Sequence, residues 1–150
     1  MHSILRDCQA GNISSLTGTA QAEGMTPEAL ARSIAAGRTI LLKNAKRDYT
    51  PCAIGEGTKV KVNVNVGTSG QRCDPAMEME KASAAIANGA DAIMDLSTGG
   101  DLAAMRREIL KLPIPVGTVP IYEAVRRAGN VIDLTPDLLF KVIREQAEQG

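Results

Sequence analysis

The sequence predicts an α/β protein built around a parallel sheet, and three observations favour this class. Strand-like and helix-like segments alternate at intervals of roughly 25–30 residues, which is typical of parallel strands joined by helical crossovers. Residues 59–66 alternate strictly between polar residues and valine, the pattern of a β-strand. With no tryptophan, one phenylalanine and two tyrosines, the core must be built from aliphatic side chains, as in parallel α/β proteins.

The first third of the chain predicts a small segment ahead of this repeat. Residues 1–24 are polar and rich in small residues, so we expect a weakly ordered arm with at most one short helix. Its His2, the only histidine, is a poor candidate for a base or metal ligand because it follows the initiator methionine. Thr26-Pro27-Glu28 then begins a helix that ends at Gly37. A short strand over 39–42 and a polar connection over 43–58 complete a segment that we assign to residues 1–58.

The segment 59–69 is the strongest strand signal in the chain. Its valines occupy every second position, and it ends in the polar turn Gly67-Thr68-Ser69. In a half-exposed strand, the polar face looks toward water. In a strand of a barrel with helices outside, the valines pack under the helices and the asparagines point into the lumen. The alternation by itself is compatible with either arrangement.

From residue 59 onward the strand and helix signals recur in order. They predict a helix beginning at Asp74-Pro75, a strand over 91–97, a helix from Asp101 to Leu112, a strand over 114–119, a helix over 120–128, and a last helix that begins at Thr135 with Leu139, Val142 and Ile143 on its inner face. Three strands cannot close a barrel. We therefore interpret residues 59–150 as the first βα units of a larger α/β domain and expect the chain to be truncated within it.

Composition argues against several classes of protein. The 17 basic and 17 acidic residues balance, and no run of Lys or Arg exceeds two, which argues against a nucleic-acid-binding or membrane-surface module. Neither a membrane-span pattern nor a signal-peptide pattern is found, so we expect a cytoplasmic protein. Cys8, Cys52 and Cys73 are widely spaced. They predict reduced structural thiols and no metal or iron–sulfur site within these residues.

Functional residues of parallel α/β proteins lie in the loops that follow the strands. Three such loops are predicted, over 65–69, 94–100 and 117–122, and each combines glycine with hydroxyl or amide groups. These groups can serve an anion or a heterocycle. One such loop is weak evidence because Gly, Ser and Thr are ordinary turn residues, but three at the same edge strengthen the inference.

Individual residues in these loops leave alternatives open. Asn65 either holds a heterocycle through its paired donor and acceptor or satisfies a neighbouring backbone. Met94 by pattern belongs to the core. Asp95 is either a base or anchor, or it caps the amides of Thr98 and Gly99. Tyr122 either hydrogen-bonds a polar ligand group or lies at the surface. No pairing of nucleophile and base is visible.

Four blocks of the sequence carry a resemblance to a known family. Residues 61–67 (KVNVNVG), 92–99 (AIMDLSTG), 117–122 (GTVPIY) and 145–150 (EQAEQG) resemble consecutive blocks of the phosphomethylpyrimidine synthase (ThiC) family. The resemblance extends from about residue 54 to the end of the chain, with Val64 and Val66 in place of the more usual Ala and Ile. It implies the first part of a (β/α)8 TIM-type barrel.

The resemblance also implies an activity. Members are radical S-adenosylmethionine carbon–carbon lyases that convert 5-aminoimidazole ribonucleotide to hydroxymethylpyrimidine phosphate in thiamine biosynthesis. They use a 4Fe–4S cluster, S-adenosylmethionine and a further zinc or iron, whose ligands we expect outside residues 1–150, and they form homodimers. By the family's motif, Asn65, Met94 and Tyr122 contact the substrate. The 150-residue chain alone is then expected to be catalytically inactive.

Two other functions remain open at this point. The related 5-hydroxybenzimidazole synthase resembles the same family throughout, uses the same substrate and cofactors, and makes a cobamide base. A non-catalytic binding protein built from a partial barrel is the alternative outside enzymology. The exposed edges of an unfinished sheet argue against this last reading because they favour aggregation.

Overall fold

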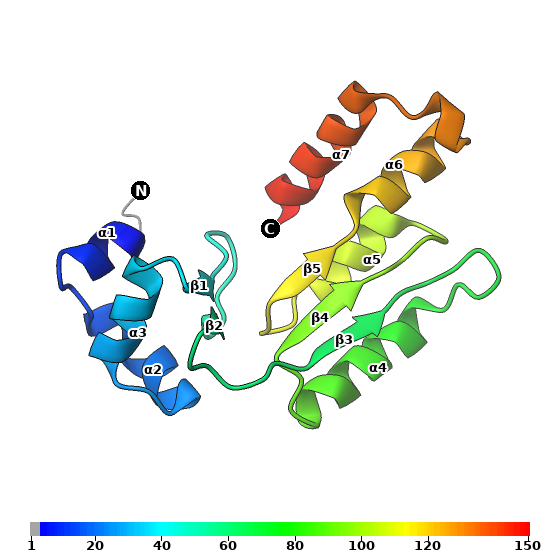
Figure 1. Ribbon diagram of the computed structural model, residues 1–150. Helices are drawn as coiled ribbons and strands as arrows, with labels where there is room; N and C mark the ends of the chain where they lie inside the picture. The colour runs from blue at the N-terminus through cyan, green and yellow to red at the C-terminus, as the bar shows by residue number, and fades with distance from the viewer. Residues whose placement is uncertain (1–3) are drawn as a thin grey trace. The chain divides into compact units, whose positions relative to one another are not determined.

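The computed structural model describes residues 4–150, which divide into two compact units (Figure 1). The first comprises the chain up to Asn44 together with Tyr49–Lys61, and the second comprises Ala45–Asp48 and Val62–Gly150.

The first unit is a helical cluster packed with a two-stranded sheet. Its elements are α1 (Ile4–Gln9), the 3-10 helix η1 (Ser14–Leu16), α2 (Thr17–Glu23), α3 (Pro27–Ala35), β1 (Thr39–Leu42) and β2 (Cys52–Gly55), and β2 pairs antiparallel with β1. Leu16, Ala20, Leu30 and Ala53 are fully buried in its core.

Two expectations about this region are wrong. Over residues 4–24 the chain is not a weakly ordered arm, because α1, η1 and α2 bury Leu16 and Ala20 against the other helices. The polar connection predicted over 43–58 also contains a strand, β2, which the sequence analysis missed. Residues 1–3, including His2, lie outside the described residues.

The second unit contains a parallel sheet with strand order β3-β4-β5. Its elements are β3 (Asn63–Val66), α4 (Pro75–Ala87), β4 (Ala92–Asp95), α5 (Leu102–Ile109), β5 (Val116–Thr118), α6 (Pro120–Ala128), the 3-10 helix η2 (Val131–Asp133) and α7 (Pro136–Gln149). The α/β class with a parallel sheet is confirmed. The described residues form a three-stranded sheet and not a closed barrel.

The helix starts follow from local chemistry. Thr26, Asp74, Asp101 and Thr135 each accept a hydrogen bond from the backbone amide three residues ahead, which satisfies an amide that the helix leaves unpaired. Except at Asp101, a proline follows the cap and occupies the first helical turn. All four starts were predicted from the sequence.

The two faces of the parallel sheet differ in character. Val64, Ile93 and Val116 are neighbours across the strands and pack with α4 and α5, whose Ala82, Met105 and Ile109 are buried in the same core. In Figure 1, α4 and α5 lie behind the sheet. Because side chains alternate along a strand, Asn65, Met94 and Gly117 lie on the opposite face.

Strand β3 is shorter than its alternation predicts. Only Asn63–Val66 is a strand, while Val60 and Val62 are 93% and 52% exposed. The segment before β3 is held by the Glu23 carboxylate, which accepts hydrogen bonds from Lys59 N and Lys61 Nζ at 2.9 and 2.7 Å. The alternation of residues identified the strand, but it could not show at which residue the strand begins, because that depends on hydrogen bonding to β4.

The predicted inner face of α7 is also partly wrong: Val142 is fully buried, but Ile143 is 41% exposed.

Candidate functional site

The centre of the candidate site is a row of three residues across the parallel sheet. Asn65 of β3 is the register partner of Met94 of β4, and Met94 is the partner of Gly117 of β5. Asn65 is exposed, and Met94 is half-buried. The structure thus places two of the predicted site residues side by side on neighbouring strands, and strands in a sheet are spaced about 4.8 Å apart. It puts Met94 on the face away from the aliphatic core, where the sequence pattern alone would not have placed it.

Tyr122, the third predicted residue, lies in the first turn of α6 and not in the row. Its side chain is 47% exposed, and its backbone amide donates to the carbonyl of Val119, the last residue before the helix. The helix begins directly after β5, so Tyr122 lies at the carboxyl edge of the sheet. The parallel topology predicts that Asn65, Met94 and Tyr122 lie toward this same edge of the sheet.

The loops after β3 and β4 are bound tightly to each other. The Ser97 hydroxyl accepts from Thr68 N at 3.1 Å, and the Thr68 hydroxyl donates to the Gly99 carbonyl at 2.7 Å. The Thr98 amide donates to the Thr68 carbonyl at 2.7 Å. A Cβ added at Gly99 would lie 2.2 Å from the backbone of Ser69, so the close approach requires glycine.

A buried carboxylate fixes the start of the first of these loops. Glu78 of α4 accepts from the Gly67 amide at 2.8 Å and from Lys81 Nζ at 2.6 Å. Burial opposes its ionisation, but the Gly67 hydrogen bond and the Lys81 charge outweigh this and lower the pKa of Glu78. The carboxylate is therefore charged at neutral pH and holds the Gly67 amide in place.

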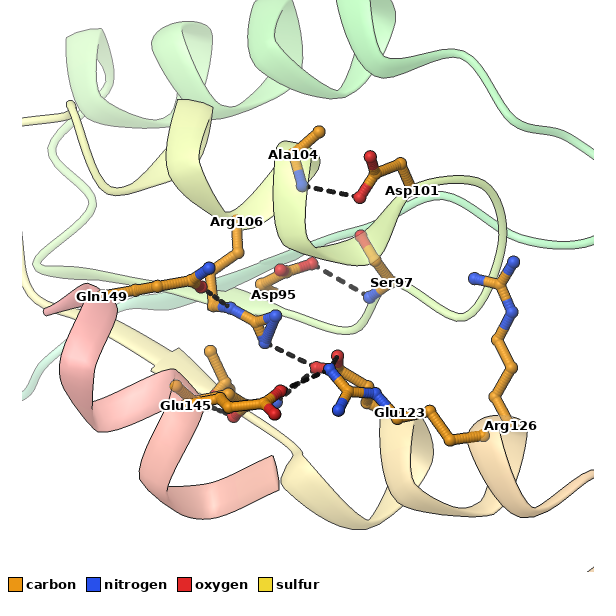
Figure 2. A network of polar contacts seen from close by, with 12 residues as sticks. Asp95, Ser97, Asp101, Ala104, Arg106, Glu123, Arg126, Glu145 and Gln149 are labelled. Atoms are coloured by element: carbon orange, nitrogen blue, oxygen red, sulfur yellow. Dashed lines mark hydrogen bonds and ion pairs between the residues drawn. The ribbon is translucent and has the colours of Figure 1, made fainter. Parts of the chain in front are cut away.

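Asp95 caps a turn in the structure, which is one of the two roles predicted for it. It is buried at the end of β4, and its Oδ1 accepts from the Ser97 amide at 2.9 Å (Figure 2). Asp95 thus caps the turn after β4, one residue earlier than the Thr98 and Gly99 amides considered from the sequence.

A buried polar network joins α5, α6 and α7 (Figure 2). Arg106 donates to Glu123 at 2.6 Å and to Gln149 at 2.6 Å, and both members of the ion pair are buried. Gln146 donates to the same Glu123 oxygen at 2.8 Å. Glu123 follows Tyr122 directly, so this network determines how the first turn of α6 is oriented.

The outer part of the network is more exposed. Arg127 pairs with Glu145 at 2.7 Å and with Glu123 at 2.6 Å. The hydrogen bond from Arg127 lowers the pKa of Glu145, and the hydrogen bond to Glu145, with that to Glu123, raises the pKa of Arg127. Thr118 at the end of β5 donates to Gln146 at 2.8 Å. Residues 145–150, at the end of the chain, therefore anchor α7 to β5 and α6.

An open cavity of about 310 Å³ lies beside this network and does not include the row. It is bordered by the start of α5 and by α6, including Asp101, Glu123, Arg126 and Arg127. Two carboxylates and two guanidinium groups balance there, and Arg126 donates to the Gly100 carbonyl at 2.6 Å. The balanced charges around this cavity favour neither an anion nor a cation, so the row of Asn65, Met94 and Gly117 remains the candidate site.

The described residues do not offer a ligand set for an iron–sulfur cluster or a divalent metal. Across residues 4–150, no three His, Cys, Asp or Glu side chains gather in a way that could hold a metal ion. Cys8 is buried, where desolvation and the nearby Asp7 carboxylate raise its thiol pKa, while Cys52 is half-buried and Cys73 is exposed. No helix in the described part of the chain is long and apolar enough to cross a membrane.

Sequence reasoning missed the residues that support the site. Gly117 was noted only as a loop glycine, although it is the register partner of Met94. Glu78, Arg106 and Glu123 were not singled out, because helix charges ordinarily face solvent. The single indication available was that Glu123 directly follows the candidate Tyr122.

Comparison with known proteins identifies the family of the chain. The chain belongs to the Radical SAM ThiC family, whose pattern matches residues 3–150. It is 45% identical over 154 residues to the phosphomethylpyrimidine synthase of Methanopyrus kandleri, covering 98% of this chain and 36% of that protein. The phosphomethylpyrimidine synthases of Thermodesulfovibrio yellowstonii and Methanocaldococcus jannaschii are each 47% identical over 136 residues, covering 87% of this chain and 32% of each protein. The chain thus spans about a third of the length of these curated relatives.

Proposed function

We propose that this chain is part of a phosphomethylpyrimidine synthase that converts 5-aminoimidazole ribonucleotide to hydroxymethylpyrimidine phosphate in thiamine biosynthesis. The observation that carries the proposal is the in-register pairing of Asn65 with Met94 on the sheet face opposite the core. Family membership and the names of the relatives support it. We assign residues 59–150 to the first βα units of a (β/α)8 barrel. The outer strands β3 and β5 each have a single strand partner among the described residues, which suits a sheet that continues.

The proposed site residues have complementary chemistry for an aminoimidazole. The Asn65 amide supplies both a donor and an acceptor, which suits a ring nitrogen next to an exocyclic amine. The Met94 thioether offers a polarisable contact for the face or edge of a flat ring. We place the Tyr122 hydroxyl on a polar substituent of the substrate. None of the three supplies a base, so their role is to bind and orient the substrate.

We place the cofactors on residues outside 1–150. Membership of a radical S-adenosylmethionine family implies S-adenosylmethionine and an iron–sulfur cluster, which would supply the one-electron chemistry. The cysteines of this chain do not gather into a ligand set for a metal or cluster. By family resemblance we also propose a zinc or iron held outside these residues, a homodimer and a cytoplasmic location. Metal analysis and sedimentation of the full-length protein test the first two.

Product identification tests the proposed activity. The full-length protein, with its cluster reconstituted without oxygen, is supplied with 5-aminoimidazole ribonucleotide, S-adenosylmethionine and a reductant, and its products are identified by mass. Hydroxymethylpyrimidine phosphate together with 5′-deoxyadenosine supports the proposal. 5-Hydroxybenzimidazole would instead identify the benzimidazole enzyme. Substrate binding with neither product nor deoxyadenosine would favour a non-catalytic binding protein.

A matched pair of variants tests the site. Asn65→Ala removes the amide, and we expect the KM for 5-aminoimidazole ribonucleotide to rise about tenfold or more, because a polar substrate group then loses its partner. Asn63→Ala, two residues earlier on the same exposed face, serves as the control and should leave KM nearly unchanged. Equal effects of the two substitutions would contradict the assignment of Asn65.

A further inference from the structure

The Met94 side chain lies over Gly117. A Cβ added at Gly117 would be 2.9 Å from Met94 Cε and 3.0 Å from Met94 Sδ. Both distances are shorter than the optimal separation of about 3.5–4.0 Å between non-bonded carbon atoms. The end of the methionine side chain therefore occupies the space that any side chain at position 117 would need.

The backbone of Gly117 does not itself require glycine. Gly117 is absent from the glycines with positive φ among the described residues, and it sits in the middle of β5 with Thr118 and Val116 on either side. Glycine weakens the interior of a strand and often marks a close approach of another group. The group that approaches here is the Met94 thioether.

The direction of Met94 has a consequence for Asn65. Met94 is on the middle strand, with Asn65 as its partner on one side and Gly117 on the other. The thioether extends over Gly117, and Asn65 on the other side is exposed. A methyl group at position 117 would move the thioether either off the sheet or back toward Asn65. Both movements fill the space in which a flat ring would meet the amide.

We propose that Gly117 is a positioning residue, which leaves room for the Met94 side chain to lie against β5 so that a flat heterocycle reaches the Asn65 amide. This inference rests on the proposed function and names a residue of the same site. It predicts that the effect of a substitution at position 117 is transmitted through the Met94 side chain. Without that side chain, the added methyl group has little to displace.

A double-mutant cycle in the full-length protein tests this coupling. The dissociation constant for 5-aminoimidazole ribonucleotide is measured by calorimetry without oxygen for the wild type, Gly117→Ala, Met94→Ala and the double variant. We expect Gly117→Ala to weaken binding about tenfold in the wild-type background and less than about twofold in the Met94→Ala background. Gly18→Ala is the control, since a Cβ at Gly18 meets nothing within 4 Å, and it should leave binding unchanged.

The outcomes separate the two proposals. No binding by the wild type would overturn both the proposed function and the role of Gly117. Binding by the wild type with unchanged affinity in Gly117→Ala, or with equal losses in both backgrounds, would overturn the role of Gly117 alone. If Gly117→Ala fails to fold, the double variant, which lacks the clash, is compared with Met94→Ala. A further loss of more than about twofold there would also overturn the inference.

Discussion

Arg106 and Glu123 form a buried ion pair at 2.6 Å across 17 residues of sequence, joining α5 to α6. Gln146 and Gln149 of α7 complete its hydrogen bonds. A buried ion pair contributes little net stability compared with apolar residues, but removing one partner leaves an uncompensated charge. The pair therefore makes the packing of three helices depend on a few polar atoms.

The first prediction concerns this pair. Arg106→Met removes the buried guanidinium partner of Glu123, which keeps its pair with the more exposed Arg127, and we expect the free energy of unfolding to fall by about 1–3 kcal/mol. Hydrogen exchange of peptides from α6 and α7 in the full-length protein measures the change locally. Glu108→Gln, which breaks the exposed pair with Lys111, should cost less than about 1 kcal/mol. Similar costs for the two variants would show that the Arg106 pair is not buried in solution.

The second prediction concerns the contact between the strand-end loops. Gly99→Ala would place a methyl group 2.2 Å from the Ser69 carbonyl, so the two loops must separate. We expect faster hydrogen exchange over both residues 67–73 and 96–101, with loss of the Thr68–Gly99 hydrogen bond. Gly70→Ala is the neighbouring control because a Cβ there meets nothing within 4 Å. Exchange that rises in only one loop would contradict this coupling.

The third prediction follows from the lowered pKa of Glu78. A carboxyl group whose pKa is lower in the folded state than its ordinary pKa of 4.5 stabilises the fold at pH values above 4.5. This stabilisation is lost as the pH falls through the folded-state pKa. Glu78→Gln should therefore be less stable than the wild type at pH 7. The difference should narrow below about pH 4.5 as Glu78 is protonated. Melting temperatures of both proteins from pH 7 to pH 3.5 measure it, and a constant difference would refute the assignment.

The fourth prediction concerns Arg47, which belongs to the second unit. Its guanidinium donates to the carbonyls of Leu110, Leu112 and Ile114 at 2.7, 2.6 and 3.0 Å. These carbonyls lie between the end of α5 and β5, and the Leu112 carbonyl also accepts from the Ile114 amide. Arg47→Met should destabilise this turn by about 1–3 kcal/mol. Arg38→Met, whose pair with Glu56 is exposed, is the control for a lost surface arginine, and an equal effect would count against the role of Arg47.

The sequence predicted features that depend on residues close together in the chain, and it failed for features that depend on residues far apart in the chain. Caps at Thr26, Asp74 and Thr135 depend on residues three positions apart, so local sequence contains the whole signal. The burial of Leu16 and the true start of β3 depend on partners distant in sequence, and these expectations were wrong. The same limit explains why Met94 was identified by resemblance and not by periodicity: its face is defined by Asn65 and Gly117 on other strands.

The mutual binding of the loops after β3 and β4 has a thermodynamic consequence. Thr68, Ser97 and Gly99 hold these loops through buried hydrogen bonds, so much of their conformational entropy is already lost when the protein folds. A ligand that meets this edge then needs to order little backbone, and such preorganisation favours affinity. Any closure over a bound ligand would have to come from segments other than these two loops.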